Sequence, residues 1–257
     1  MLVKDIIEKL EELSPLNYAC DWDNVGLILG SKNSEVKKIL IALDLHNDLV
    51  EQAIKENVDL VITHHPMIFK GLKQINDDNF VSSKILKLIT NSINVYAMHT
   101  NFDVCGSMAE VAAKKLWLSD LEVLTPTNDD GKGLGVIGNM AHLNLRSFSF
   151  VVKDTFKLDN IKVYGNLNHL IHRVAILPGS GRSSIDDAIK KGADVMITGD
   201  ITHHDGVDAT DRGLKIIDAG HYGIEKIFID FIANYISENF EGLEIIKEEE
   251  KELFNWL

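Results

Sequence analysis

Five side chains at three points of the sequence have the types and the spacing of metal ligands. His64 and His65 stand side by side after an apolar segment, and Asp103 lies in the motif HTNFD. His221 and Glu225 are four residues apart, a spacing that puts both side chains on one face of a helix. Imidazoles combined with carboxylates suit zinc, iron, manganese, cobalt or nickel better than they suit calcium. These five residues are therefore candidate ligands of divalent metal ions.

Each of these motifs, taken alone, also fits an ordinary structural role. The histidine pair fits one buried, hydrogen-bonded ring and one exposed ring. Asp103 fits a turn or helix cap, His99 in the same motif fits a partner of a ligand, and His221 with Glu225 fits a surface hydrogen bond. Their joint occurrence favours the metal site. Five ligands can hold two ions if a carboxylate bridges them, and ions roughly 3.5–4 Å apart can share a hydroxide nucleophile, which suits hydrolysis.

The segments that must position these residues alternate between strand and helix patterns. Strands are expected at 38–46, 58–66 and 94–100, with helices at 49–57 and 81–92. Nearly continuous apolar strands separated by helices predict an α/β fold with mostly parallel sheets, covered by helices on both faces. Ligands in such folds gather at the carboxyl ends of the strands, where the candidate residues stand.

The second half of the chain repeats the alternation. Strands are expected in the segments 161–165, 172–179, 193–200 and 214–221, with helices at 185–192 and 222–240. The turn-rich segment 125–133 is the expected boundary between two lobes. We expect an N-terminal α/β lobe at 1–126 that carries the histidine pair and Asp103. A second α/β lobe at 127–257 would follow, with the final helix, about 222–240, returning to complete the metal site.

An internal repeat links the two lobes. Residues 36–65 align with residues 171–200 at a constant offset of 135 without a gap, and each copy reads as strand, helix and strand. Either the lobes are related by duplication, or two unrelated units look alike because both need apolar strands and an amphipathic helix. The first copy ends in His64-His65, where the second has Gly199-Asp200. The scaffold does not require histidines there.

Composition excludes several classes of protein. The formal net charge of −13 argues against binding of nucleic acid or anionic lipid, which needs clustered Lys and Arg. Cys20 and Cys105 form no CxxC pair, so no disulfide framework is expected. The first 13 residues have the pattern of a charged amphipathic helix rather than a secretory or membrane segment. These features favour a cytoplasmic protein without membrane association.

Five motifs in order resemble the GTP cyclohydrolase I type 2 homologue family, also called NIF-three-like or YbgI-like proteins, in the short form without an inserted domain. The motifs are WDNVGL (22–27), ITHHP (62–66), HTNFD (99–103), TGDITHHD (198–205) and GHYGIE (220–225). The resemblance implies a NIF-three-like fold and a dinuclear site on the five candidate ligands. It implies that Glu225 bridges both ions, that His65 and Asp103 hold one, and that His64 and His221 hold the other. It also implies a ring-shaped homohexamer whose sites face an internal cavity.

Two classes of function follow. The first is a metal-dependent hydrolase of a small cyclic amide, amidine or phosphate-containing metabolite, for which the family name makes GTP one candidate. The second is a non-catalytic metal-binding protein that acts as an oligomeric scaffold or regulatory partner. In TGDITHHD, Asp200 and His204 either transfer protons or contact substrate, or they belong to a helix N-cap followed by surface histidines.

Two glycine-rich motifs and one acidic motif remain. Gly133, Gly135 and Gly138 match G-x-G-x-x-G but lack the strand-turn-helix setting of a nucleotide loop, so they are expected in a loop that leads into an edge strand. PGSGR (178–182) is either an ordinary turn or an anion site that uses Arg182. Asp23, in WDNVGL, is either a partner of the site residues or part of a packed segment.

Overall fold

The chain folds into two compact units. The computed structural model describes residues 1–105, 107–249 and 254. Unit 1 comprises residues 1–102 with 228–257, and unit 2 comprises residues 103–227. The turn-rich segment 125–133, at which we expected the lobe boundary, connects two paired strands inside unit 2.

Unit 1 contains a five-stranded sheet in the order β1-β4-β3-β2-β11. The three central strands, β2 (Lys38–Ala42), β3 (Leu60–Thr63) and β4 (Asn94–Ala97), run parallel to one another. At the edges, β11 (Glu244–Lys247) is parallel to β2 and β1 (Gly26–Leu29) is antiparallel to β4. Nearly every residue of the central strands is buried, as expected for a sheet covered on both faces.

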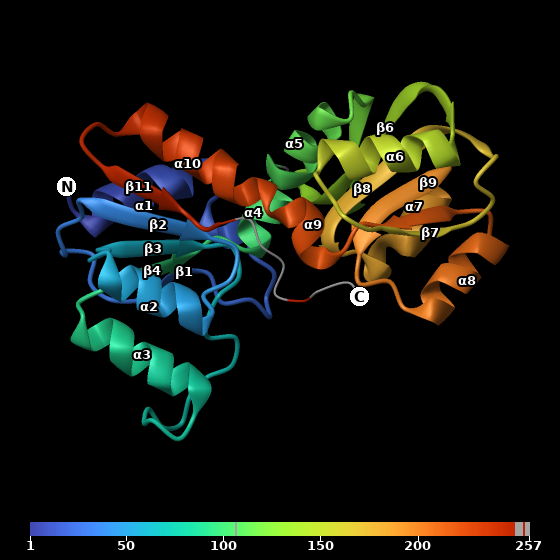
Figure 1. Ribbon diagram of the computed structural model, residues 1–257. Coiled ribbons are helices and arrows are strands. Elements are labelled where there is room, and N and C mark those ends of the chain that lie inside the picture. The colour runs from blue at the N-terminus through green and yellow to red at the C-terminus, as the bar shows by residue number, and fades with distance from the viewer. Residues whose placement is uncertain (106, 250–253, 255–257) are drawn as a thin grey trace. The chain divides into compact units, whose positions relative to one another are not determined.

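Helices cover both faces of this sheet (Figure 1). On one face lie α1 (Val3–Leu13) and α10 (Ile227–Asn239), and on the other lie α2 (Asn47–Lys55) and α3 (Phe80–Thr90). The N-terminal segment is the amphipathic helix expected from its pattern, with four apolar side chains buried. The short helices η1 (Leu16–Tyr18) and α4 (Thr100–Val104) lie before β1 and after β4 in the chain.

Unit 2 contains a six-stranded mixed sheet in the order β5-β6-β8-β9-β10-β7. The strands are β5 (Ser119–Pro126), β6 (Gly133–Asn144), β7 (Lys162–Tyr164), β8 (Leu170–Ser180), β9 (Val195–Gly199) and β10 (Lys215–Asp218). Only the pairs β8-β9 and β9-β10 of this sheet are parallel among the described residues. Two α/β units are therefore confirmed. In the second sheet, the three parallel strands have antiparallel pairing on both sides, of β6 with β8 and β5 with β6 on one and of β7 with β10 on the other.

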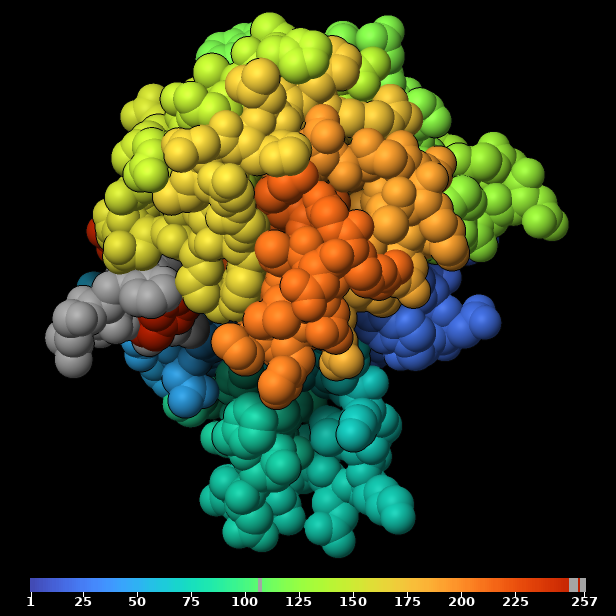
Figure 2. Space-filling model, turned by 90° about the vertical axis from the view of Figure 1, so that its right-hand side faces the viewer, coloured from blue at the N-terminus to red at the C-terminus, as the bar shows by residue number. Residues whose placement is uncertain are grey.

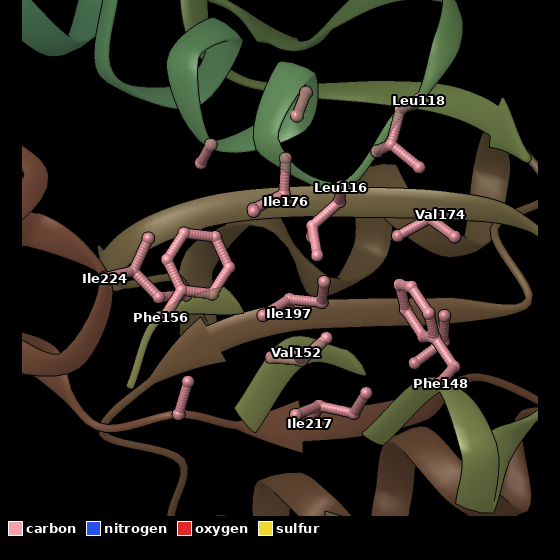
Figure 3. Close-up of a cluster of buried hydrophobic side chains, with 14 of the residues drawn as sticks. Leu116, Leu118, Phe148, Val152, Phe156, Val174, Ile176, Ile197, Ile217 and Ile224 are labelled. Atoms are coloured by element: carbon pink, nitrogen blue, oxygen red, sulfur yellow. The ribbon is translucent and has the colours of Figure 1, made fainter. Parts of the chain in front are cut away.

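Two apolar layers enclose the sheet of unit 2. On one face α5 (Ser107–Lys115), α6 (Leu145–Thr155) and α9 (His221–Glu225) contribute to a core that includes Phe148 and Ile197 (Figure 3). On the other face α7 (Ile185–Lys190) and α8 (His203–Asp211) pack on the sheet, with η2 (Arg182–Ser184) before them in the chain. Consecutive side chains of β8 and β9 point alternately into the two layers, because the side chains of a strand alternate between the two faces of its sheet.

The repeat seen in the sequence has the same strand register in both copies. Ile41 of β2 pairs with Ile62 of β3, and their counterparts Ile176 and Ile197 pair in β8 and β9. A second pair of segments, β4-α4 and β10-α9, corresponds at an offset of 121, with identical lengths of strand and helix. Shared register across four strands is more than two unrelated βαβ units require, so the structure supports a duplication.

One carboxylate anchors each copy in the same way. Asp59 Oδ2 accepts hydrogen bonds from the backbone N–H groups of Lys37 and Lys38, at 2.8 and 2.9 Å. Asp194, 135 residues later, accepts the same pair of bonds from His172 and Arg173, both at 2.8 Å. Each aspartate thus binds two consecutive backbone N–H groups of the chain that runs into or along the preceding strand of the repeat, at the first residue of β2 and within β8.

The three glycines of the G-x-G-x-x-G match lie in β6, which is an interior strand, so the expected loop and edge strand are wrong. A Cβ at Gly133 would come within 2.1 Å of the Thr125 carbonyl oxygen, and one at Gly138 within 2.7 Å of the Ser119 carbonyl oxygen. Gly133 and Gly138 therefore permit the close approach of β5.

Across the described part of the chain, no helix combines the length and the hydropathy needed to cross a bilayer.

Candidate metal centre

The histidine pair lies where β3 ends, in unit 1. The backbone N–H groups of His64 and His65 both donate towards the end of β2, to the carbonyl oxygens of Ala42 and Leu43, so the chain leaves the regular strand pattern after Thr63. The Thr63 hydroxyl donates to the His65 carbonyl oxygen at 2.8 Å and bends the chain before Pro66. The two imidazole rings lie 4.9 Å apart between centroids, so both address one region.

Each ring of the pair is held by its Nδ1 atom. In His64, which is fully buried, Nδ1 lies 2.7 Å from the carbonyl oxygen of Met98. A carbonyl oxygen can only accept, so Nδ1 carries the proton and the lone pair of the neutral ring is on Nε2. In His65, Nδ1 lies 3.0 Å from Asp44 Oδ1, which selects the same tautomer. Metal-binding histidines are oriented in this way by a carbonyl or carboxylate behind them.

His99 is a third imidazole in the same place. Its ring centroid lies 5.1 Å from that of His64 and 5.2 Å from that of His65. The three rings can offer ligand atoms that all lie within 4.8 Å of one another. The sequence suggested that His99 is a partner of the ligands, and the structure makes it a further candidate ligand.

Asp23 contacts His99 and the first residue of α4, Thr100. Its Oδ1 accepts from His99 Nδ1 at 2.9 Å, and its Oδ2 accepts from the backbone N–H and the hydroxyl of Thr100. Burial raises the pKa of Asp23, but the bonds from His99 and Thr100 outweigh it and bring the pKa down to about 2. Asp103 follows on α4, partly buried and one helical turn beyond His99. Asp23 therefore interacts with the site residues, one of the two alternatives for WDNVGL.

His221 and Glu225 lie on α9 of unit 2, at the carboxyl end of β10. The Nε2 atom of His221 is 3.2 Å from Oε2 of Glu225, so the two side chains share one helical face as their spacing predicts. Behind the ring, Asp200 Oδ2 lies 2.7 Å from His221 Nδ1. Glu225 is buried. The imidazole is again held at Nδ1 by a carboxylate, with Nε2 directed at the other candidate ligand.

Two glycines make room for this pair. Gly179, at the end of β8, has φ +71°, and a Cβ there would lie 2.1 Å from Glu225 Oε1 and 3.5 Å from His221 Nε2. Gly199, at the end of β9, would place a Cβ 2.6 Å from the backbone nitrogen of His221. From its sequence, Gly179 was expected in a turn or an anion-binding loop. Its alignment with Asp44 in the repeat is the signal that marks it as part of a site.

The segment TGDITHHD has mixed roles. Asp200 contacts His221, whereas His204 is exposed in the first turn of α8 with its ring beside that of His203. Thr202 caps this helix, its hydroxyl accepting from the backbone N–H of Asp205. Arg182, considered for anion binding, donates from Nε to Asp205 at 2.9 Å. The arginine is thus engaged by a carboxylate.

A groove of about 660 Å³ opens beside His65 in unit 1. Its walls are largely apolar, with Phe69 and Phe80 among them and the cation of Lys84 at one side. Phe69 stacks on Trp22 with ring centroids 6.1 Å apart, and these rings are 48% and 61% exposed. Both lie edge-on to His99. Exposed rings beside a candidate metal site suit a planar organic ligand.

The donor set of the described residues fits a borderline divalent metal. Unit 1 offers a cluster of imidazoles, and unit 2 offers an imidazole with a buried carboxylate. Ring nitrogen and carboxylate oxygen are the donors that zinc, iron, manganese, cobalt and nickel accept.

A family match, related sequences and a solved structure all connect the chain with the same group of proteins. The family described as Duf34/NIF3 (NGG1p interacting factor 3) matches residues 1–252. A Lactococcus lactis protein named GTP cyclohydrolase 1 type 2 homolog is 36% identical over 255 residues, covering 98% of this chain and 97% of that protein. A protein of the same name from Clostridium acetobutylicum is 36% identical over 228 residues, covering 87% and 85%. The crystal structure of a Bacillus cereus protein related to NIF3 superposes with a TM-score of 0.90 at 25% identity, covering 100% of this chain and 99% of that one.

Proposed function

The chain belongs to the Duf34/NIF3 family, and on that premise we propose that it is a metal-dependent hydrolase with a dinuclear site. The proposed ligands are His64, His65, Asp103, His221 and Glu225. The observation that carries the proposal is that His64, His65 and His221 are oriented in the same way. Each has Nδ1 engaged by a carbonyl or carboxylate oxygen, so each presents Nε2 as a ligand atom.

The proposal requires that the ligands of unit 1 and unit 2 form one site. Glu225 would bridge the two ions, with His65 and Asp103 on one and His64 and His221 on the other. The space left by Gly179 around the Glu225 carboxylate supports this role, because a bridging carboxylate needs access to both of its oxygens. His99 would then orient its neighbours or serve as an additional ligand.

Bound divalent ions would supply Lewis acidity and a water of lowered pKa at this site. The protein residues have separate tasks. Asp44, Asp200 and the Met98 carbonyl keep the ligand rings in one tautomer. His204 and Asp200 are proposed to move protons or contact substrate at the edge of the site.

The groove beside His65 supports a planar, cyclic substrate. Its apolar walls, which include the exposed ring of Phe69, would contact the face of a ring, and Lys84 would add a positive charge. The relatives' name refers to GTP, so a nucleotide-like metabolite with a cyclic amide or amidine is the proposed class of substrate. By resemblance we further propose a cytoplasmic, ring-shaped homohexamer, whose mass light scattering would measure; a monomer would contradict it.

A screen with one loss-of-ligand variant tests the proposal. Wild type, Glu225→Ala and the control Glu238→Ala, an exposed carboxylate on α10, are supplied with Mn, Zn, Co or Fe. Each is then incubated with nucleotides, cyclic amides and phosphoesters. We expect turnover by wild type and Glu238→Ala and none by Glu225→Ala, with the oligomer unchanged in all three. No turnover by wild type across the panel would favour the non-catalytic metal-binding scaffold.

A further inference from the structure

A second, smaller cavity lies in unit 2 between α6 and the segment 160–167. It has a volume of about 240 Å³. Its apolar lining comes from Ile161, Val163 and Leu167, which are partly buried and pack on the core layer shown in Figure 3. In Figure 2 the residues of α6 (yellow-green) and of this segment (yellow) cover the upper left of unit 2. The cavity therefore has an apolar base that the protein itself leaves accessible.

The opposite wall is a cationic and aromatic face of α6. Arg146, Phe150 and Lys153 line the cavity, and their spacing of four and three residues places them on one side of the helix over two turns. Phe150 is 65% exposed, so its ring is accessible to a ligand in the cavity. No carboxylate of the described residues lines the cavity, although the chain carries 39 acidic residues against 26 basic ones.

Arg146 differs from the other arginines of the chain. The other three donate to carboxylates at 2.7 to 2.9 Å: Arg173 to Glu122, Arg182 to Asp205 and Arg212 to Asp186. Arg146 has no carboxylate partner within the residues that the structure describes, and neither has Lys153. Asp154 and Asp159 line the neighbouring cavity with Lys153, but neither forms an ion pair with the two cations, so Arg146 and Lys153 can pair with an anion at the mouth of the apolar cavity.

We propose that this cavity binds a small organic anion with a planar apolar ring, of the class of aromatic carboxylates. The guanidinium of Arg146 offers paired N–H donors that match the two oxygens of a carboxylate, and Lys153 adds a second positive charge. The ring packs against Phe150 and the apolar base. A volume of about 240 Å³ has room for a single ring with one short substituent.

The combination of walls selects this class over simpler anions. Inorganic phosphate would satisfy Arg146 and Lys153 but would leave the apolar base and Phe150 in contact with water. A neutral ring of the same shape would cover the apolar base but would leave both cations without a partner. Each probe therefore tests one half of the site.

Titration by NMR and calorimetry with benzoate, benzamide and inorganic phosphate tests the proposal on the full chain. We expect benzoate to bind at least ~10-fold more tightly than benzamide or phosphate, because a charge-assisted pair and ring burial each contribute about that factor. Benzoate should shift backbone signals of residues 146–153 and 160–167. Arg146→Ala and Phe150→Ala should each weaken binding by roughly 10-fold, and Arg146→Lys by less.

Lys114→Ala, which removes an exposed lysine of α5, is the matched control and should leave the benzoate affinity unchanged. The titration is repeated after removal of metal with a chelator, and the affinity should stay the same. Equal binding of benzoate and benzamide, benzoate binding unaffected by Arg146→Ala in a folded variant, or no binding of benzoate would each overturn the proposal. The result does not depend on the metal site, so it can fail or succeed separately from the proposed hydrolase.

Discussion

Asp200 and His221 form a hydrogen bond of 2.7 Å between Oδ2 and Nδ1, although 21 residues separate them. Asp200 follows β9 and His221 follows β10, and these neighbouring parallel strands bring the two side chains together. Asp44 and His65 form a contact of the same kind in unit 1, at 3.0 Å, although the repeat aligns Asp44 with Gly179 and His65 with Asp200. In both units, therefore, a carboxylate that is hydrogen-bonded to Nδ1 orients an imidazole.

Asp200→Asn tests whether this carboxylate supports His221 as a metal ligand. An amide can accept one bond from Nδ1–H but carries no charge, so the ring loses basicity and orientation. Metal affinity, measured by competition with a chromogenic chelator, is expected to fall by about 10–100-fold. Asp208→Asn, at an exposed position of α8, should leave the affinity unchanged. Equal affinities of all three proteins would show that Asp200 does not support a ligand.

Gly179→Ala tests the space around Glu225. The new Cβ would clash with Oε1 at 2.1 Å, and the residue has φ +71°, so the carboxylate must move and the chain is strained. We expect loss of bound metal and a decrease of about 1–3 kcal/mol in the free energy of unfolding.

Gly192→Ala separates the two effects. Gly192 has φ +73°, and no atom lies within 4 Å of its added Cβ, so this variant carries the strain without the clash. Elemental analysis should find full metal content in Gly192→Ala and reduced content in Gly179→Ala. Full metal content in both would remove the proposed role of Gly179.

Asp23→Asn tests the acid-dependent stability of unit 1. The folded pKa of about 2 lies below the ordinary 3.8, so ionised Asp23 contributes stability above pH 3.8 that is lost as the pH falls towards 2. The shift corresponds to about 2 kcal/mol. Denaturant unfolding of metal-free protein should show the largest difference between wild type and variant above about pH 4. A difference that stays constant at lower pH would contradict the role of the ionised carboxylate.

Asp59→Ala and Asp194→Ala test the repeat. Each aspartate accepts two consecutive backbone N–H bonds, so each substitution leaves two donors without their partner. Similar losses of about 1–3 kcal/mol are expected in the free energy of unfolding. Asp211→Ala, which removes the exposed carboxylate at the end of α8, serves as control. A large loss at one site only would mean that the two copies are anchored differently.

The sequence predicted the elements well where hydrophobic period and turn residues agree. The strand-helix-strand segments of both repeats, the N-terminal amphipathic helix and the pairing of His221 with Glu225 on one helical face follow from local patterns. Strand ends were less predictable. The strand expected at 38–46 ends at Ala42, and the N–H of Leu43 instead donates to the Glu248 side chain 205 residues later.

The parts of the site that local patterns miss depend on contacts distant in sequence. Asp23 reaches His99 across 76 residues, and Gly179 lies against Glu225 because β8 and α9 are neighbours in the fold. The interior position of β6 depends on pairing with β5 and β8, which a run of glycines does not reveal. Such contacts depend on which strands and helices are neighbours in the fold, and local sequence patterns do not specify those neighbours.

Anomalous diffraction from crystals of the metal-loaded protein tests the dinuclear site most directly. We predict two peaks per chain, roughly 3.5–4 Å apart, with the Glu225 carboxylate on both and His64, His65, Asp103 and His221 divided between them. A structure in which metal is held by residues of one unit alone, or in which the histidine pair lies far from Glu225, would contradict the proposed site.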